Sequence, residues 1–277
     1  MKSLARTLSR NQTFERLKDW VPDGTAAAEM AGYIRQSTGR LLASAEQLEQ
    51  LPRGARVLEI GSIPYYLPLL MRELRPDLQW VATNWEGQVA STLNQGRSRH
   101  QRTGEIVQFD YYHYNVETED PAPFERESFD AVVFCEVLEH LFRDPGRAIE
   151  NLHGALRPGG HLLLTTPNPA RAYNLQRLVL RQSFYDPISG YGPYGRHNRE
   201  YGAAELATLL SAVGFEVRLA KTVESSNDHA YRRLLARLGY GEHHIVWAER
   251  RPGPAKRYRP RWLYRSYDES FYSEAPE

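Results

Sequence analysis

The hydrophobic positions between residues 126 and 168 follow the order strand, helix, strand. Residues 131–135, AVVFC, form a continuous apolar run of strand length, which is typical of a strand buried on both faces. After an Asp-Pro pair suited to the start of a helix, apolar residues recur at helical spacing from Ala148 to Leu156. A Pro-Gly-Gly turn then leads to a second apolar run, LLLTT at 162–166. The tight turns imply a right-handed parallel crossover, and therefore an α/β sheet protein.

Shorter apolar runs elsewhere predict further elements of the same sheet. Strands are expected at 57–60, 80–83, 215–219 and 245–248. Helices are expected at 67–74, 170–180, 203–212 and 228–238. The stretch from 104 to 119 alternates only weakly, and the residues up to about 51 are expected to be helical. We therefore divide the chain into a helical cap at 1–52, a sheet domain at 53–250 and a tail at 251–277.

Two long segments around the central crossover resemble a known enzyme family. FDAVVFCEVLEHL, followed by LRPGGHLLLTTPN, is similar to the fourth and fifth strands of class I S-adenosylmethionine-dependent methyltransferases. The resemblance covers roughly residues 53–247. It implies a Rossmann-like, doubly wound, mostly parallel seven-stranded sheet with an antiparallel last strand. It also implies S-adenosyl-L-methionine as the cofactor and S-adenosyl-L-homocysteine as the product.

The segment after the first predicted strand, GSIPYYLPLL, resembles a variant of the family's first motif that carries Gly-x-x-Pro-Tyr. The resemblance implies that Glu59, Gly61 and Ser62 lie against the cofactor, because glycine lets the backbone approach closely. Asn84 stands where relatives carry a ribose-binding acid, and Glu86 follows two residues later. A carboxamide accepts from one hydroxyl and donates to another, without a charge. The alternative is a loop that has closed over an empty site.

The same resemblance places the loop that meets the adenine edge near residues 115–117. Asn115 or Glu117 is expected to accept a hydrogen bond from the exocyclic amine, while Val116 offers a backbone amide. Asp110 is a competing acceptor. A solvated acidic loop without a ligand is the alternative interpretation.

The turn that leaves the fourth strand reads CEVLEH, and such turns face the ligand crevice of open α/β sheets. Cys135 and Glu136 are therefore expected beside the cofactor, with Cys135 also serving as an ordinary core residue. His140 lies one helical turn beyond Glu136 and can face the same side. Two roles are open for this Glu-His pair, namely positioning of the cofactor and general-base catalysis by His140.

A glycine-rich segment after the fifth strand, GYGPYGRHNREY, carries the most distinctive chemistry. It resembles a motif of bacterial methyltransferases linked with glycan or secondary-metabolite assembly, and we expect the insertion at about 169–202 to overhang the site of methyl transfer. His197 is a candidate base for a hydroxyl nucleophile, because the ordinary pKa of imidazole is near neutrality. The candidate substrate-binding residues are Arg196, Arg199, Glu200 and Tyr201. The alternative is an internal network that only holds the loop.

Composition excludes several other classes. Hydrophobic residues form 41% of the 277 positions, and a net charge of +1 leaves no broad footprint for nucleic acid. A single cysteine excludes internal disulfides, and no apolar run approaches the length of a membrane span, so a cytoplasmic protein is expected. No metal-ligand spacing is found, since the adjacent His243 and His244 would point to opposite faces of a strand.

The segment KRYRPRWLYRSY near the C-terminus alternates basic and aromatic residues. This pattern occurs in nucleic-acid binders, where it combines stacking with phosphate contacts. The segment is short and the chain's net charge is small, so we interpret it as an arm that packs on its own domain or on a partner subunit.

The sequence therefore predicts a methyltransferase acting on an oxygen or nitrogen atom of a small molecule, sugar, or precursor of a glycan or secondary metabolite. A non-catalytic subunit with the same fold is the alternative favoured by the reduced glycine motif. A nucleic-acid methyltransferase is a further alternative, but the (Asp/Asn)-Pro-Pro-(Tyr/Phe) signature is missing after the fourth strand. The expected partner is a small-molecule or glycan-precursor acceptor, with no membrane contact and with a homodimer left open.

Overall fold

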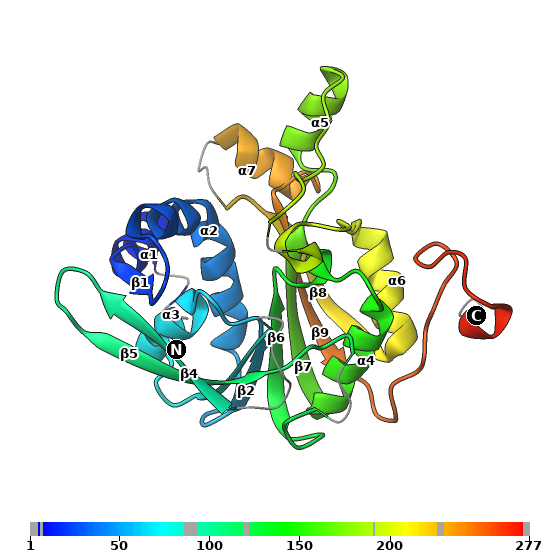
Figure 1. Ribbon diagram of the computed structural model, residues 1–277, viewed down its shortest axis with the longest axis horizontal. Coiled ribbons are helices and arrows are strands. Elements are labelled where there is room, and N and C mark those ends of the chain that lie inside the picture. The colour runs from blue at the N-terminus through cyan, green and yellow to red at the C-terminus, as the bar shows by residue number, and fades with distance from the viewer. Residues whose placement is uncertain are drawn as a thin grey trace.

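Strands from across the chain form a single sheet in the computed structural model, which describes residue 5 and residues 8–85, 93–118, 122–190, 192–225 and 230–273 (Figure 1). The strands are β1 (Trp20–Pro22), β2 (Arg56–Ile60), β3 (Gln79–Asn84), β4 (Leu93–His100), β5 (Ile106–His113), β6 (Phe129–Cys135), β7 (Leu156–Pro167), β8 (Phe215–Val223) and β9 (His243–Arg250). The helices are α1 (Arg10–Leu17), α2 (Ala27–Leu48), α3 (Tyr66–Leu74), α4 (Pro145–Ala155), α5 (Ala172–Val179), α6 (Ala203–Val213) and α7 (Ala230–Arg237). Short 3-10 turns are η2 (Leu138–His140), η3 (Pro193–Gly195) and η4 (Glu269–Phe271).

The centre of the sheet has the strand order β5-β3-β2-β6-β7-β9-β8. β2 pairs in parallel with β3 and with β6, and β6 pairs in parallel with β7, so the carboxyl ends of these strands meet at one edge. β9 lies between β7 and β8 and is antiparallel to both. The predicted doubly wound, mostly parallel sheet with an antiparallel last strand is confirmed.

Helices cover both faces of this sheet. α1, α2 and α3 lie on one side and α4 and α6 on the other (Figure 1). Alternate residues of β2 supply the two cores, with Val57 facing α2 and α3 and Leu58 facing α4 and α6. β6 and most of β7 are buried on both faces, which is why their apolar runs are unbroken. Among the described residues, every helix is too short or too polar to cross a lipid bilayer.

Beyond β5 the sheet continues into two strands that the sequence did not predict. β4 is antiparallel to β5, and β1 is antiparallel to β4. The expectation of a helical N-terminal segment is therefore wrong at Trp20–Pro22, where the Trp20 ring meets His100 edge-on with 5.1 Å between centroids. β4 reads LNQGRSRH, and a polar strand so near the sheet edge leaves no apolar alternation to detect.

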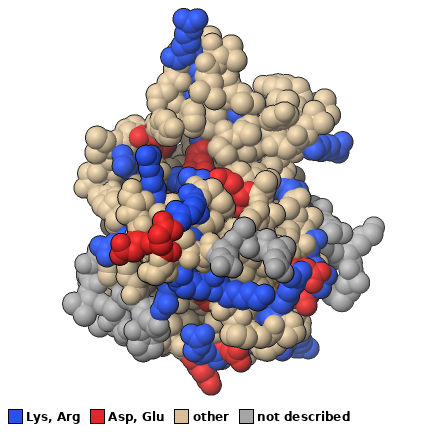
Figure 2. Space-filling model, turned by 90° about the vertical axis from the view of Figure 1, so that its right-hand side faces the viewer, with Lys and Arg blue, Asp and Glu red and all other residues tan. Residues whose placement is uncertain are grey.

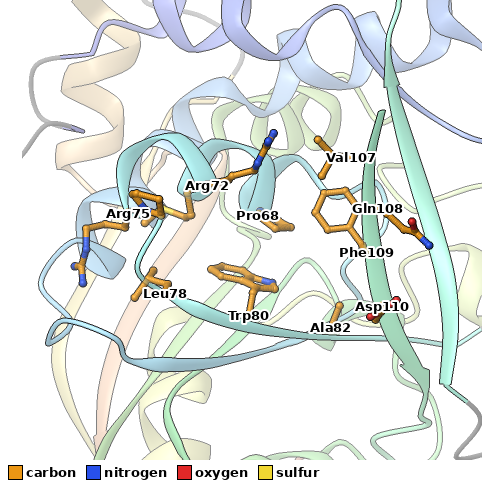
Figure 3. A pocket seen from close by; sticks show the side chains of 12 residues that line it. Pro68, Arg72, Arg75, Leu78, Trp80, Ala82, Val107, Gln108, Phe109 and Asp110 are labelled. Atoms are coloured by element: carbon orange, nitrogen blue, oxygen red, sulfur yellow. The ribbon is translucent and has the colours of Figure 1, made fainter. Parts of the chain in front are cut away.

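A cavity of about 390 Å³ lies between α3 and the strands β3 and β5 (Figure 3). Trp80 and Phe109 form part of its wall, and Arg72 of α3 and Arg75 directly after α3 border it (Figure 3). These arginines pair with acidic neighbours, Arg72 with Glu105 at 3.1 Å and Arg75 with Asp77 at 2.8 Å. Of the described residues considered for the cofactor, the competing acceptor Asp110 is the one that lines the cavity.

The C-terminal segment packs against α4. Arg259 is buried, and it donates from Nε to Asp144 Oδ2 at 2.9 Å and from Nη1 to Glu150 Oε1 at 2.5 Å. Tyr264 Oη donates to Asp144 Oδ1 at 2.5 Å and accepts from the Gly146 N–H at 2.8 Å. Acidic and basic side chains are interspersed over this side of the molecule (Figure 2). The interpretation as an arm packed on its own domain is confirmed.

We expect Arg259→Ala to lower the free energy of unfolding by about 3 kcal/mol, because it leaves two partly buried carboxylates without their cation. Arg261→Ala is the matched control, since Arg261 is exposed, forms its ion pair with the exposed Glu269 and lies over the ring of Tyr272. Urea denaturation followed by circular dichroism measures both. Equal midpoints for the two variants would show that the arm does not stabilise the domain.

Candidate active site

The loop between β2 and α3 depends on Gly61. Its φ of 73° lies in the left-handed region, and a Cβ at this position would lie 2.8 Å from Val137 Cγ2. A side chain is therefore excluded both by backbone conformation and by space. The loop backbone consequently lies close to the turn that follows β6, at the edge where the sequence predicted the cofactor.

Glu59, the penultimate residue of β2, is buried. Ser62 Oγ and Trp80 Nε1 both donate to Glu59 Oε2, the latter at 3.0 Å. Burial raises the pKa of Glu59 to about 7, although the two donors and the charge of Arg40 favour the carboxylate. The hydrogen bond between Ser62 and Glu59 thus lies within the predicted first motif.

Asn84, the last residue of β3, holds the β2–α3 loop in place. Its Oδ1 accepts from the Ile63 N–H at 2.9 Å, and its Nδ2 donates to Tyr65 Oη at 3.3 Å. An ionised acid has no donor for the second bond, so the amide suits this position. The Tyr65 hydroxyl in turn lies against β4, where a Cβ added to Gly96 would collide with it. Glu86, the second predicted ribose ligand, lies outside the described residues.

Glu117 has a role that differs from the predicted one. Its Oε1 accepts from the backbone N–H groups of Arg143 at 2.9 Å and Asp144 at 2.8 Å, and its Oε2 accepts from Tyr194 Oη at 3.1 Å. Oε1 therefore holds the chain that enters α4, and Oε2 joins this chain to η3. The expectation that Glu117 accepts a hydrogen bond from adenine is corrected accordingly.

Asn115 and Val116 follow β5 and are both buried. Asn115 Nδ2 donates to Tyr194 Oη at 2.9 Å, which connects this loop to the glycine-rich insertion. The competing acceptor Asp110 is exposed on β5, where it accepts from Gln95 Nε2 at 3.1 Å. A contact of Asn115 and Val116 with adenine stays a prediction.

Glu136 follows β6 with a φ of 56°, a left-handed conformation that is uncommon for a residue with a side chain. Its Oε1 accepts from Thr165 Oγ1 at 2.8 Å and lies 3.6 Å from Arg40 Nε, while its Oε2 lies 3.1 Å from His243 Nε2. Burial favours the protonated acid, but the charges of Arg40 and His243 outweigh it and hold the pKa of Glu136 well below its usual range. For the preceding Cys135, burial raises the pKa of the thiol to about 12, which suits an unreactive residue.

The two histidines predicted to be catalytic meet in the structure. The ring centroids of His140 and His197 are 5.0 Å apart, with the planes at 76°. His140 Nδ1 lies 3.0 Å from the carbonyl oxygen of Arg196, and His197 Nδ1 lies 3.4 Å from Glu200 Oε1. Each ring is therefore oriented through its Nδ1.

Glu139 completes this group and is fully buried. Its Oε2 accepts from Thr166 Oγ1 at 2.9 Å, whereas Oε1 lies 3.9 Å from His140 Nε2 and has no hydrogen-bond partner in the described part of the chain. Burial and then the charge of Glu136 raise the pKa of Glu139 to about 8. Burial lowers the pKa of His140; for His197 burial is outweighed by the neighbouring carboxylates, which raise its pKa.

The glycine-rich insertion is attached to the turn after β6 through its backbone. The N–H groups of Asn198 and Arg199 donate to the carbonyl oxygen of Glu139 at 2.7 and 3.2 Å. The side chain of Asn198 also donates to the carbonyl oxygen of His140 at 2.8 Å. These bonds bring His197 to His140 at the carboxyl ends of β6 and β7.

Side chains of the insertion that were predicted to bind substrate mostly stabilise the loop instead. Tyr201 is only 1% exposed and belongs to the hydrophobic core, so its predicted contact with substrate is wrong. Two others form ion pairs inside the protein, and these are Glu200 with Arg171 at 2.7 Å and Arg199 with Glu205 at 2.5 Å. Arg196 is partly exposed and remains the predicted contact for an anionic group.

A sequence profile for a methyltransferase domain matches residues 27–220, from the start of α2 into β8. The chain belongs to this methyltransferase family. It is 36% identical over 95 residues to a protein of Mycolicibacterium smegmatis named “Probable S-adenosylmethionine-dependent methyltransferase”, covering 34% of this chain and 32% of that protein. It is 32% identical over 168 residues to the ubiquinone biosynthesis O-methyltransferase of Xanthomonas axonopodis pv. citri, covering 60% of this chain and 64% of that enzyme. The alignments thus span about a third and just under two thirds of these relatives.

Solved structures support the methyltransferase fold. A chain from the Haloferax volcanii complex that contains the Trm112 methyltransferase activator superposes with a TM-score of 0.52, at 13% identity over 77% of this chain and 91% of that chain. The [4+2]-cyclase SpnF superposes with a TM-score of 0.50, at 18% identity over 83% of this chain and 84% of that chain. At such low identity the likeness concerns the fold alone.

Three residues of the candidate site, namely Arg40, Glu139 and His243, were not predicted from the sequence. Arg40 is buried in α2; burial lowers its pKa, but the charge of Glu136 outweighs this effect and holds the pKa above its usual range. Arg40 could have been noticed in the sequence, because it is a charged residue among the apolar positions of a long predicted helix. His243 is the first residue of β9, and because β9 is antiparallel to β7, this residue lies at the edge where β6 and β7 end. No local pattern in the sequence indicates its contact with Glu136.

We expect Glu117→Ala to destabilise the protein by about 2 kcal/mol, because backbone amides before α4 lose a charged acceptor. Amide hydrogen exchange at residues 142–144 should accelerate more than exchange in the strands. Glu125→Ala is the control, since Glu125 is exposed. Unchanged exchange at these amides would contradict the structural role given to Glu117.

Proposed function

We propose that this protein transfers a methyl group from S-adenosyl-L-methionine to an oxygen or nitrogen atom of a small molecule, such as a sugar or a precursor of a glycan or secondary metabolite. The observation that carries the proposal is the meeting of three groups at the carboxyl ends of β2, β6 and β7. These groups are the Gly61 loop, the Arg40–Glu136 ion pair and the cluster of Glu139, His140 and His197. An O-methyltransferase among the relatives supports the reaction class.

The residues at this edge fit the cofactor. The amino-acid end of S-adenosylmethionine carries an ammonium and a carboxylate, and the site offers charges of both signs. Arg40 Nε is buried without a hydrogen-bond partner in the described residues, and it is placed to bind the carboxylate. Glu59 and Glu136 are the acceptors for the ammonium. Gly61 has no side chain, so the cofactor can approach the backbone of this loop closely.

The remaining cofactor contacts follow the strand ends. Asn84 and Glu86 are assigned to the ribose, while Asn115 and Val116 are assigned to the adenine. Ser62 and Cys135 line the same edge through their positions beside Gly61 and Glu136. The cofactor supplies an electrophilic methyl group, so the protein mainly has to hold the nucleophile in line with it.

We place the substrate that receives the methyl group next to His140 and His197. The imidazole of His197 is oriented by Glu200, which is itself held by Arg171 at 2.7 Å. With its proton on Nδ1, the ring presents a lone pair on Nε2 toward an acceptor hydroxyl. His140 has the corresponding arrangement through the carbonyl oxygen of Arg196. The side chain of Arg196 suits a carboxylate or phosphate on the acceptor.

Calorimetric titration with S-adenosylmethionine and S-adenosylhomocysteine tests the cofactor assignment. We expect one saturable site, and at least a tenfold loss of affinity in Gly61→Ala, where the new Cβ meets Val137. Gly54→Ala is a matched control, because Gly54 has the same φ of 73° but no atom within 4 Å of the added Cβ. Absence of binding to the folded wild type would refute the proposed function, and an unchanged Gly61→Ala curve would refute the placement of the cofactor.

We expect His197→Ala to leave cofactor affinity intact and to lower turnover about a hundredfold, the usual size of a lost general acid–base contribution. Release of S-adenosylhomocysteine with a panel of small hydroxylated acceptors measures turnover. His161→Ala removes an imidazole that stacks on Trp247, in the half of β7 away from the site, and it should retain activity. Full turnover in His197→Ala would remove this residue from the reaction.

A further inference from the structure

Three side chains at the proposed acceptor site have the composition of a metal centre. One carboxylate oxygen of Glu139 and one nitrogen each of His140 and His197 all lie within 4.8 Å of one another. The first two residues belong to η2 after β6, and the third belongs to the glycine-rich insertion. Metal-ligand spacing is absent from the sequence because two of the ligands are adjacent and the third is more than fifty residues away.

Both imidazoles are prepared to ligate through one nitrogen. A metal-binding histidine usually donates its other N–H to a carbonyl or carboxylate, which fixes the tautomer and the ring orientation. His140 has the carbonyl oxygen of Arg196 at 3.0 Å from Nδ1. His197 has Glu200 Oε1 at 3.4 Å and Asp186 Oδ2 at 3.5 Å from Nδ1. In this tautomer both rings carry a lone pair on Nε2.

The carboxylate supplies an independent observation. Glu139 is fully buried, and its Oε1 has no hydrogen-bond donor among the described residues although Oε2 is bonded to Thr166. A buried carboxylate oxygen without a partner is unfavourable unless it is protonated or bound to a cation. The free oxygen lies 3.9 Å from His140 Nε2, a separation that a shared ion can bridge.

We propose that Glu139, His140 and His197 bind a divalent transition-metal ion. Two imidazoles with one carboxylate suit Zn²⁺, Co²⁺ or Fe²⁺, whereas Mg²⁺ and Ca²⁺ prefer oxygen ligands throughout. Three protein ligands leave coordination positions open, which is the pattern of catalytic rather than structural metal sites. Glu136 is outside the ligand set, because its oxygens contact Arg40, Thr165 and His243.

One consequence rests on the proposed function. A hydroxyl oxygen of the acceptor would occupy an open position, and the metal would lower its pKa, so that the O–H bond breaks and the proton passes to water. The electron pair stays on the oxygen, which then forms the bond to the methyl group while the sulfur–methyl bond of the cofactor breaks. The electron pair of that bond stays on sulfur, and S-adenosylhomocysteine leaves. The ion would thereby replace His197 as the group that deprotonates the acceptor. An amine nucleophile would not need this step.

The competing occupant of the cluster is a proton shared between Glu139 and the imidazoles. Calorimetric titration of chelator-treated, dialysed protein with ZnCl₂ separates the two, and visible absorption of the Co²⁺-loaded protein reports the coordination sphere. We expect one Zn²⁺ per chain and at least a tenfold weaker binding in both His197→Ala and the isosteric Glu139→Gln. His161→Ala is the matched control, and circular dichroism verifies that each variant is folded.

The outcomes separate this inference from the proposed function. No saturable Zn²⁺ binding, or equal binding in Glu139→Gln and wild type, overturns the metal site. If metal is absent while S-adenosylmethionine still binds and His197→Ala still loses turnover, His197 acts as a base and only the metal inference fails. If Zn²⁺ binds at the cluster while S-adenosylmethionine does not, the metal site stands and the proposed function fails.

Discussion

The carbonyl oxygen of Glu139 is the point on which the geometry of the site depends. It accepts the backbone N–H groups of Asn198 and Arg199, and this contact joins the turn after β6 to an insertion that begins after β7. After α5 the insertion carries Gly190, Gly192 and Gly195, which disfavour regular secondary structure, so backbone bonds of this kind decide where this part lies. Because His197 directly precedes the attached residues, its meeting with His140 follows from them.

Two carboxylates three residues apart behave in opposite ways in this turn. Glu136 lies between Arg40 and His243, and these neighbours hold its pKa well below the usual range against the effect of burial. For Glu139, burial and the charge of Glu136 favour the protonated form. Divergent pKa values in neighbouring acids are a mark of functional sites, since each acid is then suited to a different task. Here one acid fits the charged end of a cofactor, while the other suits a proton or a metal ion.

The sequence predicted those parts of the structure that depend on local pattern. The β6–α4–β7 crossover was predicted because unbroken apolar runs of this length, bounded by turns, are typical of buried strands. Gly61 was singled out because a glycine directly after a strand is typical of a loop with a left-handed residue. β4 was missed because a polar strand near the sheet edge has no apolar alternation. Tyr201 and Glu117 were misassigned because a polar residue on a loop looks the same whether it faces a ligand or the protein's own backbone. Only the folded structure shows which hydrogen-bond donors contact such a residue.

The contact between Tyr65 and Gly96 has a consequence for inherited variation. Gly96 lies on β4, far in sequence from every residue assigned to catalysis, and its strand is polar and near the sheet edge. Its missing side chain nevertheless makes room for the Tyr65 hydroxyl, which Asn84 binds while also holding Ile63. Any larger residue at Gly96 would displace the loop that begins at Gly61. A survey of natural variants would therefore find this peripheral position as intolerant of change as the site itself.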